Sequence, residues 1–173
     1  RINKRDLESL AAADALSALS GDRHRAFWQA SAVDKISADF SNSFFSDERF
    51  IKNDFGVDVL LPPVSEKENV FGDYASTGFT LRAHPVALYR EHLNYYKVFL
   101  ASELNNISDK VSVKVVGLVT SRQRPMTASG VTFLTLEDES GFTNVVVWPR
   151  LGERLRPVVR QSTLMGVIGQ VQE

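Results

Sequence analysis

Hydrophobic and polar residues alternate with a period of two along VSVKVVGLVTSRQ, residues 111–123, where Val113 and Val115 flank Lys114. A period of two is that of a strand, because successive side chains point to opposite faces. Gly117 interrupts the alternation, and a glycine inside a strand marks a bend or a bulge. The stretch therefore predicts one long, bent strand.

Two further strands are predicted over VTFLTLED and FTNVVVWP. The residues between them, Asp138-Glu139-Ser140-Gly141, are those that favour tight turns. A short helix over about 150–156 is expected to stop at Pro157, because proline interrupts a helix interior. Residues 162–173 predict a fourth strand, with Gly166 and Gly169 at tight places.

The predicted order is long bent strand, strand, strand, helix, strand, which is the order of an OB-fold, a five-stranded Greek-key barrel. The fifth strand is expected to follow Glu173, so residues 110–173 are predicted to be a truncated OB-fold. With the helices predicted before it, the fold class is α+β: a helical hairpin and connector helices followed by a barrel.

Residues 1–33 are predicted to form a helical hairpin, because apolar residues recur at helical spacing on both sides of Gly21. Asp22 suits the cap of the second helix. One hypothesis is that the turn contacts a phosphate backbone through Arg23, His24 or Arg25. The alternative is an αα-hairpin that only packs on a neighbouring element.

Two segments connect the hairpin to the barrel. Residues 34–70 show no sustained period but carry five phenylalanines, which predicts an extended segment pinned onto another surface rather than a flexible linker. Residues 71–109 predict connector helices, one of which begins at His84-Pro85. His84 has no ligand partner at suitable spacing, so a capping or structural role is expected for it.

Composition narrows the function classes. The 173 residues carry a net charge of -1 and no cysteine, which excludes disulfides and thiolate zinc sites. No run approaches the roughly 18 apolar residues of a spanning helix, and the first residues do not resemble a signal peptide. The sequence lacks an initiating Met, so we expect a piece of a longer protein. From residue 110 onward eight basic residues face five acidic ones, which places the positive charge in the barrel.

Alternation assigns the faces of the predicted hairpin. Leu134 and Leu136 should point into the barrel, which leaves Phe133 outside, and the same pattern leaves Asn144 and Trp148 outside on the next strand. The outer face of these strands is where OB-folds bind oligonucleotides, and aromatic rings there offer stacking surfaces for bases. The alternative is that a neighbouring domain covers both rings.

The arginines before the hairpin lie on the approach to the first loop, where they can meet phosphates. The candidate DNA-binding residues are Arg122, Arg124, Phe133, Asn144, Trp148, Lys114 and Arg150. The tight acidic group 137–139 is predicted to be a solvated turn, because alternation sends its carboxylates to opposite faces. No active site, metal site or cofactor is expected in the chain itself.

The residues also resemble a known family. RQRPMTASGVTFLTLEDESGFTNVVVWP, residues 122–149, resembles the OB domain near the C-terminus of bacterial C-family DNA polymerases, which are DNA polymerase III alpha-like, and is most similar to their error-prone branch. DYASTGFTLRAHPVALYR resembles the segment before that domain, and LAAADALSALSGDRHRAFW the end of the helix-hairpin-helix region.

This resemblance implies a cytoplasmic parent enzyme, a DNA-directed DNA polymerase of the SOS response, that performs translesion synthesis with accessory proteins of a mutagenesis complex. Its catalytic aspartates and Mg²⁺ belong to a palm domain upstream, so the chain itself is expected to be non-catalytic. The family also implies that the strand with Phe133 and the loop with Arg122 and Arg124 face the single-stranded template of a primer-template DNA. Neither a membrane nor a small-molecule substrate is expected as a partner.

Three functions stay open. In the first, the barrel holds single-stranded template. In the second, the region docks a protein, either a mutagenesis-complex subunit or a single-strand binding protein, through the Phe-rich segment. In the third, the region is a structural spacer.

Overall fold

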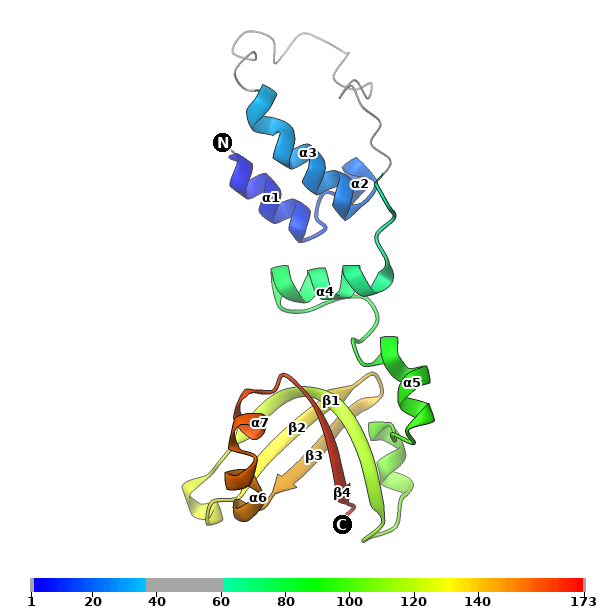
Figure 1. Cartoon of the computed structure of the whole chain (residues 1–173), viewed down its shortest axis with the longest axis vertical. Coiled ribbons are helices and arrows are strands. Elements are labelled where there is room, and N and C mark those ends of the chain that lie inside the picture. The colour runs from blue at the N-terminus through cyan, green and yellow to red at the C-terminus, as the bar shows by residue number, and fades with distance from the viewer. Residues whose placement is uncertain (1, 37–60, 173) are drawn as a thin grey trace. The chain divides into compact units, whose positions relative to one another are not determined.

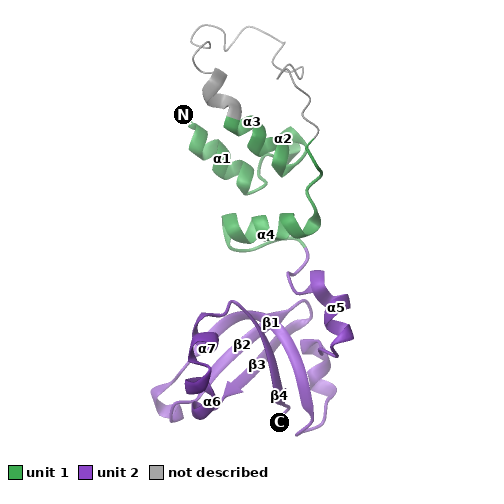
Figure 2. Cartoon of the chain, viewed as in Figure 1, with its two compact units in different colours: residues 1–82 green, residues 83–173 purple. Residues whose placement is uncertain are grey.

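The computed structural model describes residues 2–36 and 61–172 (Figure 1). The phenylalanines of the predicted Phe-rich segment lie outside these residues. The chain forms two compact units, residues 1–82 and 83–173 (Figure 2). The boundary falls inside the stretch 71–109 that the sequence suggested as one connector, because its first helix packs within unit 1 and its later helices hydrogen-bond to the barrel.

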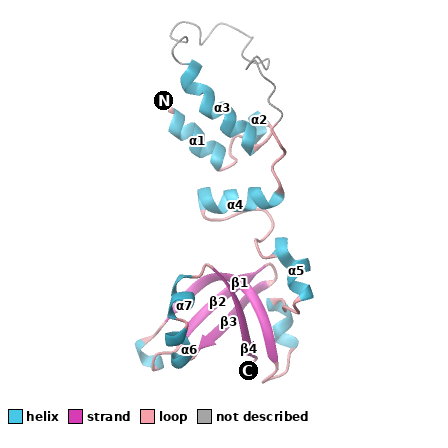
Figure 3. Cartoon of the chain, in the orientation of Figure 1, coloured by secondary structure: helices cyan, strands magenta, loops and turns pink. Residues whose placement is uncertain are grey.

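Unit 1 is helical (Figure 3). Its helices are α1 (Lys4–Ala12), α2 (Ser17–Ser20), α3 (Arg23–Ile36) and α4 (Glu66–Thr77). The predicted hairpin is present, with the short α2 inserted before Gly21, whose φ of +93° ends that helix. Asp22 caps α3, as expected, by accepting a 2.8 Å hydrogen bond from the N–H of Arg25. Small buried residues, Ala11, Ala26 and Ala30, form the apolar core between α1 and α3.

Arg23 is buried in unit 1 and joins α3 to α4. Its guanidinium forms an ion pair with Asp73 and donates a 2.9 Å hydrogen bond to the carbonyl of Asn69. A Cβ on Gly72 would lie 1.8 Å from Nη1 of Arg23, so the guanidinium fits only beside a glycine. This placement corrects the hypothesis that Arg23 contacts a phosphate, because its charge is neutralised inside the unit.

Unit 2 contains a four-stranded antiparallel sheet in the order β3-β2-β1-β4, curled into a half-barrel (Figure 3). Its elements are η2 (Ala87–Tyr89), α5 (Arg90–Tyr95), η3 (Ala101–Asn106), β1 (Ser112–Gln123), η4 (Met126–Ala128), β2 (Thr132–Asp138), β3 (Gly141–Val147), α6 (Pro149–Arg154), α7 (Arg156–Gln161) and β4 (Leu164–Gln170). The α+β class and the OB-fold order of strands are thereby confirmed.

The predicted faces of the hairpin are confirmed by burial. Leu134 and Leu136 are almost fully buried, and Val147 of β3 lies in the same cluster. Val159 of α7 and Met165 of β4 close this core from the other side. The barrel core is therefore made by alternate residues of the strands together with one helix.

Two positions in β1 determine how this strand pairs with β2. A Cβ on Gly117 would lie 2.8 Å from the carbonyl oxygen of Glu137, so this glycine allows β1 and β2 to approach closely. The irregularity of register falls further on, between Val119 and Ser121. Beyond this bulge the strand pairs Arg122 with the buried Leu134, and that pairing sets the direction of the Arg122 side chain.

The expected helix stop at Pro157 is wrong. α6 ends at Arg154, the φ of -106° and ψ of 27° of Leu155 break the helical path, and α7 begins at Arg156. Pro157 stands in the first turn of α7, where its missing N–H would have no intrahelical acceptor. The chain therefore contains two short helices where the sequence suggested one.

The acidic turn between β2 and β3 is not solvated as predicted. The Asp138 side chain is 4% exposed and accepts hydrogen bonds from the N–H of Ala101, at 2.8 Å, and from the N–H of Ser140, at 2.7 Å. Arg90 of α5 lies 3.6 Å from Asp138 and donates a 3.0 Å hydrogen bond to Glu139. These acids join α5 and η3 to the barrel.

Burial raises the pKa of Asp138. The hydrogen bonds from Ser140 and Ala101 and the charge of Arg90 outweigh that effect, so its pKa lies below the ordinary value for aspartate. Glu139 shows the same balance, in which burial is opposed chiefly by the hydrogen bond from Arg90, and its pKa is also lowered. Both groups are therefore carboxylates at neutral pH.

Candidate nucleic-acid interface

Two aromatic side chains stand on the outer face of the β2–β3 hairpin. Phe133 of β2 is 41% exposed and pairs with Val146 of β3. Trp148, two residues after Val146, is 58% exposed. Trp148 follows the end of β3 directly, and Phe133 lies near the start of the neighbouring β2. Both predicted stacking residues are therefore exposed at the same end of the hairpin.

Asn144 extends this face along β3. It pairs with Thr135, whose hydroxyl donates a 3.2 Å hydrogen bond to Oδ1 of Asn144. That bond orients the amide and leaves its N–H₂ group directed elsewhere, as a donor for a ligand. The outer face thus has two aromatic rings at one end and a polar position further along.

Arg122 does not share the outer face with Phe133. Its side chain turns toward α7, where Nε donates a 2.9 Å hydrogen bond to the carbonyl of Val159 and the guanidinium also donates to the carbonyl of Ser162. Carbonyls at the end of a helix lack intrahelical donors, so Arg122 caps α7 at its C-terminus. Arg122, which was predicted to contact a phosphate, therefore stabilises the barrel.

Arg124 lies over the first loop. Gly130 of that loop has a φ of +86°, and a Cβ there would lie 3.3 Å from Nη2 of Arg124 and 3.6 Å from Pro149. The glycine therefore lets the loop backbone, the guanidinium and the start of α6 approach one another.

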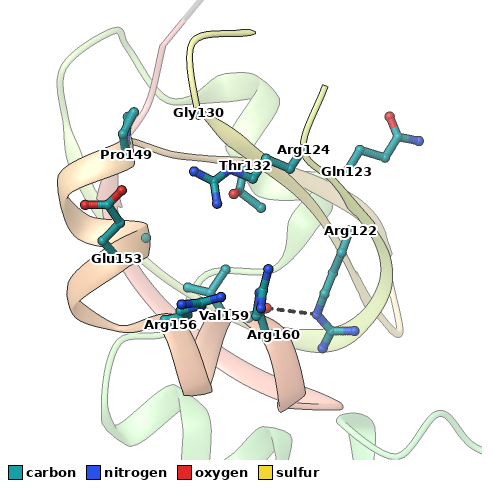
Figure 4. A pocket seen from close by; sticks show the side chains of 11 residues that line it. Arg122, Gln123, Arg124, Gly130, Thr132, Pro149, Glu153, Arg156, Val159 and Arg160 are labelled. Atoms are coloured by element: carbon teal, nitrogen blue, oxygen red, sulfur yellow. Dashed lines mark hydrogen bonds between the residues drawn. The ribbon is translucent and has the colours of Figure 1, made fainter. Parts of the chain in front are cut away.

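A cavity of about 510 Å³ opens at this end of the barrel, between the start of the hairpin and the two helices α6 and α7 (Figure 4). Its lining residues are Arg122, Gln123, Arg124, Gly130, Thr132, Pro149, Gly152, Glu153, Arg156, Val159 and Arg160. Four of them are arginines and one is a glutamate, so the cavity has an excess of positive charge. We call it the arginine cavity.

The other sequence candidates lie outside this cavity. Lys114 is near the start of β1, and eight residues at about 3.3 Å each separate it from Arg122; its Nζ donates to the carbonyl of Tyr96 at 3.3 Å. Arg150 is exposed on α6 but does not line the cavity. Arg25 lies in unit 1, where its Nε is 3.8 Å from Asp22. Their predicted contacts with DNA stay predictions.

Sequence reasoning missed Arg156 and Arg160. They are four residues apart in α7, so they lie on one face of that helix. The spacing of four residues was visible in the sequence. Because the helix was expected to stop at Pro157, however, Arg160 was placed outside any helix, and the shared helix face of the two arginines was not predicted.

Other kinds of site are missing from the part of the chain that the structure describes. There, no three His, Cys, Asp or Glu side chains gather in a way that could hold a metal ion. Nor does any described helix combine the length and the apolar surface required to cross a membrane. His84 accepts a 3.2 Å hydrogen bond at Nδ1 from the N–H of Val86, which is a local structural contact, whereas the N-cap of η2 is Val86 itself.

Comparison with known proteins agrees with this geometry. A family profile described as an OB-fold nucleic acid binding domain matches residues 113–173. This chain is 40% identical to the error-prone DNA polymerase of Methylococcus capsulatus over 172 residues, which are 99% of the chain. The chain is homologous to a region of the error-prone DNA polymerases.

Other relatives support the same conclusion. The error-prone DNA polymerase of Dechloromonas aromatica is 41% identical over 171 residues, again 99% of the chain, and that of Pseudomonas fluorescens is 45% identical over 161 residues, or 93% of the chain. The matched region is 16% of the Methylococcus and Dechloromonas proteins and 15% of the Pseudomonas one. The resemblance to the error-prone branch is confirmed, and the chain spans about a sixth of these relatives' length.

Proposed function

We propose that unit 2 binds the single-stranded template of an error-prone DNA polymerase while the enzyme copies damaged DNA. The observation that carries the proposal is the pair of exposed rings, Phe133 and Trp148, on the face of an OB-fold sheet. On this face of an OB-fold sheet, exposed aromatic rings are the surfaces on which the bases of an oligonucleotide stack. Bases of any sequence can stack on them, which suits an enzyme that must accept altered template bases.

The electrostatics support the same ligand. Arg124 and the arginine cavity lie at the end of the hairpin that carries the two rings. A single strand presents both flat bases and charged phosphates, and this end of the barrel offers partners for both. Binding by this combination depends on salt and only weakly on sequence.

The remaining parts of the function concern the whole enzyme. Nucleotide addition with Mg²⁺ would be performed by a catalytic domain elsewhere in the parent protein, and this chain would hold the template for it. Participation in the SOS response and contact with accessory proteins of a mutagenesis complex belong to the same proposal. They rest on the similarity to error-prone polymerases.

Fluorescence anisotropy of a labelled oligothymidylate, titrated with the chain at low and moderate salt, tests this function. Replacing Phe133 or Trp148 by Ala should weaken binding by roughly 5- to 150-fold, which corresponds to about 1–3 kcal/mol per stacked base. Phe79→Ala is the matched control, because Phe79 is 59% exposed but belongs to unit 1. It should leave the affinity unchanged.

The absence of binding at tens of micromolar by the folded chain would overturn the proposal. The protein-docking hypothesis would then take its place, and deletion of the Phe-rich segment, followed by assay of the parent enzyme with its accessory proteins, would test that hypothesis.

A further inference from the structure

The arginine cavity contains more positive charge than the barrel needs for its own structure. Arg122 is engaged with the carbonyls that end α7. Arg124, Arg156 and Arg160, in contrast, form no ion pair within 4.0 Å with any carboxylate of the described residues. Glu153 also lines the cavity but lies beyond that distance from each of them. Their mutual repulsion would be relieved by an anion.

The walls of the cavity are suited to hold such an anion. Gly130 lets Arg124 lie against the loop, while Arg156 and Arg160 project from one face of α7 (Figure 4). Val159, which is buried, and Pro149 add apolar surface to the lining on opposite sides of the cavity. Guanidinium groups that approach from two sides can donate several charge-assisted hydrogen bonds to one phosphate.

The cavity is also next to the two exposed rings, Phe133 and Trp148. Gln123 lines the cavity and pairs with Phe133, and Thr132, which also lines it, immediately precedes Phe133. On the neighbouring strand, Trp148 immediately precedes Pro149 of the cavity wall. Each ring is therefore one residue from the cavity, although it points to the opposite face of the sheet.

We propose that the arginine cavity holds a backbone phosphate of the single strand whose bases stack on Phe133 and Trp148, so that the strand turns over the rim of the barrel at Gln123. This inference rests on the proposed function and assigns phosphate-binding roles to Arg156 and Arg160. Stacking on the outer face supplies sequence-independent affinity, and the cavity sets the position of the backbone.

Oligothymidylate affinity, measured over a range of salt concentrations, tests the proposal with the double variant Arg156→Ala, Arg160→Ala. The affinity should fall roughly tenfold or more, and the slope of log affinity against log salt should become shallower by about 0.7 for each phosphate that the variant no longer neutralises. Phe133→Ala should lower the affinity without changing that slope. Arg154→Ala is the matched control, because Arg154 is an exposed arginine of α6 outside the cavity.

A neutral linkage gives a second measurement. Oligothymidylates that carry one methylphosphonate, moved along the strand, should show one position at which removing the charge weakens binding to the unaltered chain. At that position the methylphosphonate should weaken binding to the double variant less than binding to the unaltered chain, because Arg124 is then the only one of the three unpaired arginines left to bind the charge. Circular dichroism and thermal unfolding of the double variant and of Phe133→Ala check that the barrel is intact.

The outcomes separate the two proposals. If the unaltered chain binds no oligonucleotide, the proposed function fails and this inference fails with it. If it binds, and the double variant has the same affinity and salt slope as the unaltered chain, the cavity has no phosphate ligand and only this inference is overturned. An equal methylphosphonate effect in both proteins would overturn it as well.

Discussion

The carboxylate of Asp138 accepts a 2.8 Å hydrogen bond from the backbone N–H of Ala101, 37 residues earlier in the chain. The same carboxylate accepts from Ser140 and lies beside Arg90, so one buried acid joins η3 and α5 to the β2–β3 turn. This joint connects the OB-fold sheet to the helices that precede it within unit 2.

Replacing Asp138 by Ala should therefore destabilise unit 2. The change leaves the N–H of Ala101 without its acceptor and removes one of the acids beside Arg90, and the expected loss is about 2–4 kcal/mol in the free energy of unfolding. Urea denaturation followed by circular dichroism measures it. Asp109→Ala is the control, since Asp109 forms only an exposed pair with Lys110 at 3.8 Å. Equal losses for the two variants would contradict the assigned role of Asp138.

Stability should also depend on pH in the acid range. The pKa values of Asp138, Glu139 and Asp73 are lowered in the folded state. A lowered pKa adds stability above the unfolded value, about 4 for these groups, and the addition is lost as the pH falls through the folded pKa. Urea midpoints should therefore be steady near neutral pH and fall below about pH 4. Asp138→Asn should flatten this dependence, whereas an unchanged profile would exclude Asp138 as a contributor.

Gly72→Ala should destabilise unit 1. The added Cβ would overlap the guanidinium of Arg23, which cannot move without leaving Asp73, and overpacking of this kind costs roughly 1–3 kcal/mol. Gly152→Ala is a helical control, because its Cβ would meet only Val147 at an ordinary 3.7 Å. That change should be neutral or stabilising by up to about 1 kcal/mol. Thermal unfolding of both variants distinguishes a steric effect from a general effect of glycine replacement.

Arg122 and Arg124 should differ in their effects on stability. Arg122→Ala removes the donors for the carbonyls of Val159 and Ser162 and should lower the free energy of unfolding by about 1–3 kcal/mol. Arg124→Ala leaves this cap on α7 intact and should change stability little while weakening DNA binding. Urea denaturation of the two variants measures the difference. Comparable destabilisation by both would contradict the assigned cap on α7.

Trp148 should report DNA binding directly. The sequence contains two tryptophans, Trp28 in unit 1 and Trp148 in unit 2, so Trp28→Phe leaves one emitter beside the arginine cavity. A stacked base quenches indole emission, so adding oligothymidylate should lower the fluorescence of this variant. The reciprocal variant Trp148→Phe is the control, and quenching of its remaining Trp28 would place DNA on unit 1 instead.

Local pattern was sufficient to predict the barrel. The alternation around Leu134 and Leu136 correctly assigned these residues to the inner face and Phe133 to the outer face. It could do so because the side-chain period of a strand is a geometric property of its backbone. The order of elements then indicated the fold, since few topologies share that order.

Interactions between distant residues could not be predicted in the same way. The pair Arg23–Asp73 spans 50 residues, and Asp138 is buried only because η3 packs on the turn. No period or spacing in the sequence relates such partners. The direction of Arg122 was missed for a related reason: the bulge between Val119 and Ser121 changes the face on which later residues of β1 lie.

The break between α6 and α7 at Leu155 uncouples the orientations of the two helices. In one continuous helix, the orientation of Arg156 and Arg160 would be locked to that of Pro149 and Gly152 by helical phase. With the break, α7 can be reoriented by substitutions near Leu155 while α6 keeps its place after β3. The two arginines of α7 are therefore positioned independently of the residues of α6 that line the same cavity.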